Sequence, residues 1–402
     1  MVKESFLKLA NEIENEIIND RRWLHAHAET GFELDETVKY VKERLTEIGC
    51  KYTDCGTSGV IAFVGNDEPA FLLRADMDAL PGEEKSGENF ASENGNMHAC
   101  GHDMHTAMLL GVASILKKHE KDLKGTVKLM FQPAEETLCG AKKMVENGVL
   151  NSPEVTGALM LHVLSGIPVK TGTIIIPSEG VGAPAADYFT INVQGKGCHG
   201  STPQLGIDAL TSSSHILIAL QEISARELGV SDSAVLTVGS LHGGTTGNVI
   251  ADTAVLQGTM RAFDDKIRDI MKKRLCEIAE SVGSAFRTKV TVSFGGGCPT
   301  FLNDGALAES TAKALGELLG NEWVINADDF PKESRQKGGS EDFAYVSQKV
   351  PSLMLSLAAG EPDKGHKYTQ HHPKVTFDES VLKTGAVAMA YIAYKLQEEQ
   401  KH

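Results

Sequence analysis

The sequence predicts an α/β protein of two domains, in which a mostly parallel sheet flanked by helices is interrupted by a smaller inserted domain. Three observations support this prediction. The chain has 402 residues, which is too long for one ordinary hydrophobic core. Short apolar runs alternate with helical patterns at both ends of the chain, as in parallel sheets covered on both faces. Between about residues 185 and 299 the pattern becomes β-α-β-β-α-β, the order of a ferredoxin-like unit.

The first residues predict an amphipathic helix, because Phe6, Leu9, Ile13 and Ile17 recur at helical spacing. They lack the basic start and the apolar core of a signal peptide. The longest apolar run, Val381 to Leu396, is interrupted by two lysines and is too short to cross a bilayer. We therefore expect a packed C-terminal helix and no membrane partner.

The larger domain is predicted to contain, in order, a strand, a helix and two strands, and after the insertion a strand and a helix. These elements cover Phe71–Leu73, about Asp103–Lys118, Val127–Phe131, Ala158–Leu161, Ser352–Leu357 and the residues from Val381 onward. In such sheets, sites form where parallel strands deliver residues at their carboxyl ends. The polar residues that follow directly on these strands are Asp76, Asp78, Glu135, Glu136 and His162.

The inserted domain is predicted from alternating apolar residues in its strands and helical periodicity in its helices. Its elements are Tyr188–Val193, Asp208–Leu228, Ala234–Leu241, Thr253–Phe263, Asp264–Val282 and Val290–Phe294. Because candidate site residues lie on both sides of it, we assign residues 1–184 and 300–402 to one discontinuous catalytic domain and 185–299 to the inserted domain. Glycine-rich stretches at Gly180–Pro184 and Gly295–Gly297 suit hinges.

Composition excludes some partners and suggests a compartment. A formal net charge of −15 argues against nucleic acid, whose phosphates require a basic face. The seven cysteines are odd in number and scattered, which is unlike a disulfide framework. Reduced thiols, and therefore a cytoplasmic location, are expected.

The segment from Met97 to Asp103 places a thiol, two imidazoles and a carboxylate in one turn before a predicted helix. Cys100 and His102, separated by Gly101, can both reach one divalent ion. An isolated buried cysteine is more often a small hydrophobic residue. The adjacent Asp103 and the carboxylates at the strand ends favour metal ligation here.

Two consecutive glutamates, Glu135 and Glu136, follow an apolar strand. Paired glutamates usually belong to a solvated surface, but at a sheet edge one can ligate an ion while its neighbour takes a proton from water. His162 alone would more often be a hydrogen-bonded core residue. Spacing leaves open which of His371 and His372 points inward.

Several motifs in this order make the chain resemble the N-acyl-amino-acid amidohydrolase family. That family includes hippurate hydrolase, N-acetyl-diaminopimelate deacetylase and the indole-acetyl-amino-acid hydrolases, within the aminoacylase and glutamate carboxypeptidase clan. The motifs are Arg74–Pro81, His98–Asp103, Gln132–Glu136, Gly339–Phe343 and the His-x-Pro at 371–373. The match runs from about Trp23 to Glu379. The resemblance implies a metallopeptidase catalytic domain and an inserted lid and dimerisation domain, hence a homodimer.

The resemblance also implies two divalent metal ions per subunit. Cys100 would be a bridging thiolate, His102 and His162 would complete one ion site, and Glu136 with His371 would complete the other. Zinc is favoured by the sulfur ligand, although manganese, cobalt and nickel are compatible with the histidines and carboxylates.

By the same resemblance, Glu135 would be the general base and later the general acid. In the wider clan a His-x-Asp motif supplies a ligand and its supporting carboxylate, and Asp76 and Asp78 stand in that place. We assign both aspartates supporting roles beside the ligands.

In the inserted domain, Gly195–Ser201 resembles the family's glycine-rich turn. Its histidine, here His199, would stabilise the oxyanion, in related dimers from the neighbouring subunit. Asn248 and Arg261 match positions that hold the substrate carboxylate, for which arginine is a natural bidentate partner. Without the resemblance, a turn histidine is as often an exposed loop residue.

These expectations describe hydrolysis of a small-molecule N-acyl amino acid by a hydroxide held between two ions. A dipeptidase or carboxypeptidase of the same clan is an alternative, because it differs only in what the acyl pocket admits. A metal-dependent binding protein without catalysis is a second alternative, against which the base Glu135 argues. A purely structural site would usually use four Cys/His ligands.

Overall fold

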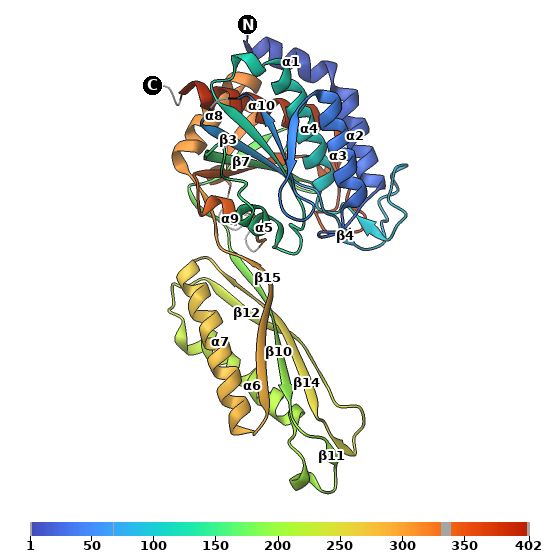
Figure 1. The fold of residues 1–402 in the computed structure, drawn as a ribbon, viewed down its shortest axis with the longest axis vertical. Helices are drawn as coiled ribbons and strands as arrows, with labels where there is room; N and C mark the ends of the chain where they lie inside the picture. The colour runs from blue at the N-terminus through green and yellow to red at the C-terminus, as the bar shows by residue number, and fades with distance from the viewer. Residues whose placement is uncertain (1, 67, 331–338, 400–402) are drawn as a thin grey trace. The chain divides into compact units, whose positions relative to one another are not determined.

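The computed structural model describes residues 2–66, 68–330 and 339–399 (Figure 1). By compactness the chain divides into two units. Of the described residues, the larger unit contains 2–66, 68–182, 302–330 and 342–399, and the smaller unit contains 183–301 and 339–341. No helix in these described ranges is long and apolar enough to cross a membrane.

The larger unit is built on a sheet whose described strands have the order β1-β2-β6-β3-β7-β18-β8-β17. These strands are β1 Lys51–Asp54, β2 Val60–Val64, β3 Ala70–Asp76, β6 Thr126–Gln132, β7 Val155–Leu164, β8 Ile174–Ile176, β17 Val324–Asn326 and β18 Ser352–Ala358. Strand β3 is parallel to β6 and β7, and β7 is parallel to β18. The carboxyl ends of these strands therefore meet at one edge. The remaining short strands of this unit include β4 Leu80–Pro81 and β5 Asn96–Met97.

Helices flank this sheet, which confirms the predicted α/β class. They are α1 Val2–Glu12, α2 Glu14–Ala26, α3 Asp35–Ile48, α4 His102–Lys118, α5 Gly140–Glu146, α8 Gly305–Leu319, α9 Ala344–Ser347 and α10 Leu382–Glu399. Helix α4 packs against the sheet and against α2 and α10. It is apolar on nearly all sides, as expected of a helix with neighbours all round.

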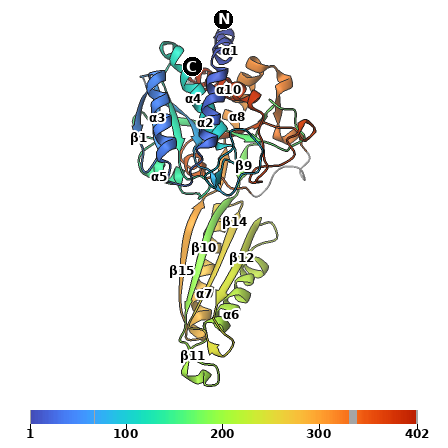
Figure 2. The ribbon, with the colours of Figure 1, turned by 90° about the vertical axis from the view of Figure 1, so that its right-hand side faces the viewer.

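The smaller unit has the predicted β-α-β-β-α-β order (Figure 2). Its main elements are β10 Ala185–Gln194, α6 Ala209–Glu222, β12 Ala234–Gly243, β14 Thr253–Ala262, α7 Asp265–Ala285 and β15 Lys289–Cys298. The strands form an antiparallel sheet of order β12-β14-β10-β15. Phe189, Ile191 and Val193 alternate toward the core shared with α6 and α7, while Tyr188 faces outward. A small two-stranded antiparallel sheet pairs β11 Cys198–His199 with β13 Val249–Ile250.

Two details differ from the sequence predictions. The N-terminal amphipathic region is two helices, because α1 ends at Glu12 and α2 begins at Glu14. The glycine-rich stretches expected as hinges are extended: β9 spans Gly180–Ala183, and Gly295–Gly297 continue β15. Glycine permits but does not require a turn, so pairing decided the conformation.

Candidate metal centre

The predicted metal-ligating residues of the larger unit gather at the carboxyl edge of the parallel strands. Asp76 is the last residue of β3, and Glu135 lies three residues after β6 ends at Gln132. His162 lies within β7 rather than after it, because β7 continues to Leu164 in register with β18. It still sits near the carboxyl end, so its position at the edge is unchanged.

A tight turn brings Cys100 and His102 together. Gly101 has φ of 92°, and a Cβ atom there would lie 2.4 Å from the Val163 Cγ2 atom, so no other residue fits. His102 then opens α4 and donates from Nδ1 to the Asp78 backbone oxygen at 2.7 Å. That bond leaves the buried Nε2 atom pointing into the cluster, without a hydrogen-bond partner among the described residues. A buried polar atom in this state indicates a ligand to be bound.

Electrostatics around His102 favour a positive charge. Burial alone would lower the pKa of His102, but the Asp76 and Cys100 side chains outweigh it and raise the pKa well above its usual value. The Asp76 Oδ2 atom lies 3.5 Å from His102 Nε2. A cation at this point would replace a proton, which is the usual competition at metal sites.

Cys100 and His162 face each other, with Sγ and Nε2 3.5 Å apart. His162 donates from Nδ1 to the Val163 backbone oxygen at 2.7 Å, so its Nε2 lone pair is available. Burial, with His105 nearby, lowers the pKa of His162 to about 3 and keeps the ring neutral. Burial raises the pKa of the Cys100 thiol, and a bound cation would reverse that effect.

The turn that carries Glu135 and Glu136 is tightly constrained. Ala134 and Leu138 on either side of the pair both have φ of 55°, in the left-handed region that such residues rarely adopt. The two Asp78 carboxylate oxygens accept from the backbone N–H groups of Glu135 and Glu136, at 2.9 and 3.1 Å. Asp78 therefore holds the backbone of both glutamates directly.

The Glu136 carboxylate faces the candidate ligands. Its Oε1 atom lies 3.5 Å from His371 Nε2 and 3.9 Å from His102 Nε2. Within the described part of the chain this buried oxygen forms no well-aligned hydrogen bond. Burial, followed by the charges of Asp78 and Asp76, raises the pKa of Glu136 to about 7.

Of the two adjacent histidines that spacing left open, the structure brings His371 to the cluster. His371 has φ of 66°, and its backbone N–H donates to the Ala99 oxygen at 2.9 Å. The left-handed residue turns the side chain toward Glu136. His372 instead stacks on Tyr368, with ring centroids 4.0 Å apart.

The candidate ligand atoms form two groups that share one sulfur. In each group, one atom from every residue lies within 4.8 Å of the others. One group is Cys100, His102 and His162, and the other is Cys100, Glu136 and His371. Sulfur, nitrogen and carboxylate oxygen suit zinc and other transition-metal ions, so the residues fit a pair of ions bridged by one thiolate.

Asp76 lies beside the candidate ligand His102 and contacts residues that surround the cluster. Burial would raise its pKa, but Arg74, His102 and His105 hold it well below the usual value. Its two oxygens accept from Arg74 Nη1 and His105 Nδ1, each at 2.6 Å. Sequence reasoning missed the roles of Arg74 and His105, although the spacing of His102 and His105 by three residues predicts one helix face.

The smaller unit holds the other predicted site residues, and it does not bring them all together. His199 pairs with Val249 in the two-stranded sheet, and the Gly200 backbone N–H donates to the Asn248 oxygen at 2.8 Å, so His199 and Asn248 are neighbours. Arg261 lies near the far end of β14, eight residues beyond Thr253. At roughly 3.3 Å per residue that is about 26 Å of strand.

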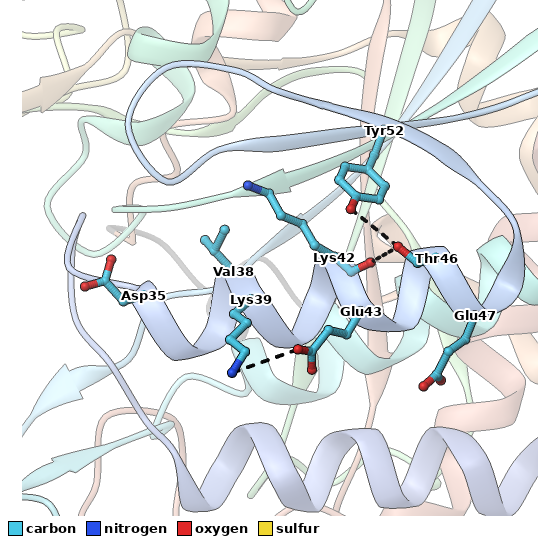
Figure 3. Close-up of a pocket in the computed structure, with 8 residues that line it drawn as sticks. All are labelled: Asp35, Val38, Lys39, Lys42, Glu43, Thr46, Glu47 and Tyr52. Carbon is cyan, nitrogen blue, oxygen red and sulfur yellow. Dashed lines mark hydrogen bonds and ion pairs between the residues drawn. The ribbon is translucent and has the colours of Figure 1, made fainter.

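A surface groove of about 610 Å³ lies elsewhere (Figure 3). It runs along α3 beside β1 and contains none of the predicted site residues. Two of its charged groups, Lys39 and Glu43, form a 4.0 Å ion pair with each other. Mutually paired surface charges indicate a solvated helix face.

Comparison with known proteins agrees with this geometry. A model described as peptidase family M20/M25/M40 matches residues 72–395. N-acetyl-L-cysteine deacetylase from Bacillus subtilis (strain 168) is 37% identical over 391 residues, which cover 95% of this chain and 88% of that protein. IAA-amino acid hydrolase ILR1-like 4 from Arabidopsis thaliana is 35% identical over 409 residues, which cover 100% of this chain and 90% of that protein.

A solved structure shares the fold along nearly the whole chain. It is the crystal structure of the Bacillus subtilis YXEP protein, described as a dinuclear metal-binding peptidase from the M20 family. It matches with a TM-score of 0.76 and 31% identity, over 96% of this chain and 99% of that one. The resemblance predicted from the motifs is confirmed. The chain belongs to peptidase family M20/M25/M40.

Proposed function

We propose that this protein is a metal-dependent amidohydrolase that cleaves small N-acyl amino acids into a carboxylate and a free amino acid. One observation carries the proposal: two groups of ligand atoms share Cys100, and the glutamate preceding the ligand Glu136 lies beside them. The deacetylase and the IAA-amino acid hydrolase among the relatives act on amides of amino acids, according to their names. The known dinuclear relative supports a pair of ions.

Cys100, His102 and His162 would hold one ion, and Cys100, Glu136 and His371 the other. Such ions would acidify a water molecule and polarise the substrate carbonyl. We propose zinc, because a thiolate is among the ligands, with manganese, cobalt or nickel as alternatives. Metal analysis of protein made without added salts tests this assignment, and a manganese-only content would contradict it.

The chain's own residues would then transfer protons and bind the charged groups of the substrate. Glu135, whose backbone Asp78 holds, would take the proton of the attacking water and deliver it to the departing nitrogen. His199 would stabilise the developing oxyanion. Asn248 and Arg261 would hold the substrate carboxylate.

We further propose that the smaller unit is an inserted lid and dimerisation domain, at about residues 185–299. Helix α6 has no Asp, Glu, Lys or Arg before Glu222, yet Ile218 is 65% exposed. Strand β12 is a sheet edge on which Val235 is 55% exposed. An uncharged helix face and an open edge strand favour pairing with a second copy.

A homodimer would also account for the separation within the smaller unit. Asn248 and Arg261 cannot both contact one small substrate from the same chain, since about 26 Å of strand separates their ends of β14. A second copy would supply His199 and Asn248 to the opposite site. We also propose a cytoplasmic location, because none of the seven cysteines, all of which the structure describes, forms a disulfide.

The decisive assay compares substrates with metal-loaded protein. N-acetyl amino acids, hippurate and dipeptides are offered side by side, and release of free amino acid is measured. Faster hydrolysis of the N-acyl amino acids is expected. Preference for dipeptides would establish the dipeptidase or carboxypeptidase alternative, and saturable binding without product would establish a binding protein.

A further inference from the structure

His105 lies within the buried cluster, but the proposed function gives it no role. Its side chain and those of Asp76 and His102 offer atoms within 4.8 Å of one another, as a third set of metal ligands would. Both ring nitrogens of His105 are nevertheless engaged. Nδ1 lies 2.6 Å from Asp76 Oδ1, and Nε2 lies 2.9 Å from the backbone nitrogen of Val163.

The Val163 contact assigns the proton on this ring. A backbone N–H can only donate, so Nε2 of His105 accepts and carries no hydrogen. Nδ1 then carries the ring proton and donates it to Asp76. His105 therefore cannot ligate an ion without losing one of these bonds. His105 links the end of β3, through Asp76, to the end of β7, through Val163.

The backbone of Val163 is in turn shared between two parts of the cluster. Its carbonyl oxygen accepts from His162 Nδ1 at 2.7 Å and from the side-chain amide of Gln370 at 2.6 Å. The first bond orients the His162 imidazole. The second holds the residue immediately before His371. One backbone residue thus fixes a candidate ligand from each of the two groups.

We infer that His105 and Gln370 are positioning residues that hold the two ion sites in register through the Val163 backbone. The hydrogen bonds run from Asp76 through His105 to Val163, and from Val163 to His162 and Gln370. This inference rests on the proposed dinuclear function. Groups that orient metal ligands typically change metal affinity or activity by about 10–100-fold when removed.

Two substitutions of His105 distinguish positioning through hydrogen bonds from a contribution to packing alone. His105→Asn keeps an amide near the Nδ1 position and loses the acceptor for Val163. His105→Gln reaches the Nε2 position with an amide oxygen that can accept from the Val163 N–H. Positioning through Val163 predicts that His105→Gln retains metal better than His105→Asn. Because Asn is smaller than Gln, a packing role would lower the thermal midpoint of the metal-free His105→Asn protein, whereas positioning predicts the difference in metal affinity even where the two midpoints agree.

Gln370→Met tests the second connection, because it keeps the length of the side chain and removes the donor. Zinc stoichiometry and affinity are measured by competition with a chromophoric chelator, and the visible spectrum of the cobalt-substituted protein reports ligand geometry. The thermal midpoint of each metal-free protein monitors folding. His372→Asn, on the same loop, and Met104→Leu, on the same helix, are matched controls.

Wild-type protein is expected to bind two ions. Gln370→Met should weaken one of them by about 10–100-fold with an altered cobalt spectrum, while the controls remain within threefold of wild type. His105→Asn should weaken binding more than His105→Gln. If Gln370→Met and His105→Asn both bind metal with wild-type affinity and give the wild-type cobalt spectrum, the inference is overturned and the proposed function is not affected. A wild-type protein that binds no ions would contradict the proposed function itself.

Discussion

The cluster in the larger unit and the predicted site residues of the smaller unit are organised in opposite ways. In the larger unit, His102 and His162 are each fixed by a hydrogen bond from Nδ1 to a backbone oxygen, and Nε2 faces the cluster. In the smaller unit, His199 is exposed on the short strand β11, and Arg261 lies near the far end of β14. The first region is arranged as a site within one chain. The second distributes its predicted site residues along the unit and does not bring them together.

The largest expected effect separates catalysis from metal binding in the larger unit. Glu135→Gln should retain both ions and lose activity by about 10²–10⁴-fold, since an amide cannot take the proton of water. Turnover of an N-acyl amino acid and metal content are measured together. Glu83→Gln, an exposed acid, is the control. Activity of Glu135→Gln within tenfold of wild type would remove Glu135 from its role.

A somewhat smaller loss is expected when His199 in the smaller unit is replaced. His199→Ala should lower kcat by about 10²–10³-fold through loss of an oxyanion donor. If His199 serves the partner's site, mixing His199→Ala with Glu135→Gln after subunit exchange should restore activity, because each mixed dimer contains one intact site. Absence of any recovery in verified mixed dimers would show that the two residues act within one chain.

Substitution of Asp78 tests how far metal binding and activity depend on the hydrogen bonds that hold the backbone of Glu135 and Glu136. Asp78→Asn presents an amide nitrogen to one of the two glutamate N–H groups, so the turn loses one acceptor. A loss of metal affinity or activity of about 10–100-fold is expected, measured by chelator competition. Asp54→Asn, an exposed acid on β1, should behave as wild type. Unchanged affinity in Asp78→Asn would contradict a supporting role.

The smallest effect concerns pH. Burial raises the pKa of Glu136 to about 7, so below that pH an incoming cation must displace a proton. Binding also releases protons from His102 and Cys100, whose pKa values are raised, so apparent zinc affinity should fall with falling pH throughout. Below about pH 7 the fall should steepen by at most about a further tenfold per pH unit for the Glu136 proton. Chelator competition across this range measures it. A slope that stays the same across pH 7 would show that Glu136 is already ionised.

Much of the larger unit's architecture was predictable, because its central strands are continuous apolar runs. The predicted strand at Phe71–Leu73 is the middle of β3, and the predicted helix from about Asp103 coincides with α4. The outer strands β1 and β17 were not predicted. Both are short and partly exposed, and β17 pairs with β8, a strand distant from it in the sequence.

The candidate cluster was only partly predictable for a related reason. Cys100 and His102 are close in sequence, so residue type and spacing suffice to suggest a ligand pair. His371 and His372 are chemically equivalent in the sequence. Only the left-handed backbone at His371 and its bond to Ala99 distinguish them. His105 and Gln370 became visible only through their bonds to Val163.

By itself, the sequence determined the α/β class, the family and the kinds of donor atom available, because apolar periodicity and residue chemistry are local properties of the chain. The tertiary structure decided which donors converge, which imidazole nitrogen each histidine presents, and which residues of the smaller unit stay apart. These depend on strand pairing and on hydrogen bonds between segments far apart in the sequence, such as Gln370 and Val163, which are 207 residues apart. Sequence spacing does not encode such distances.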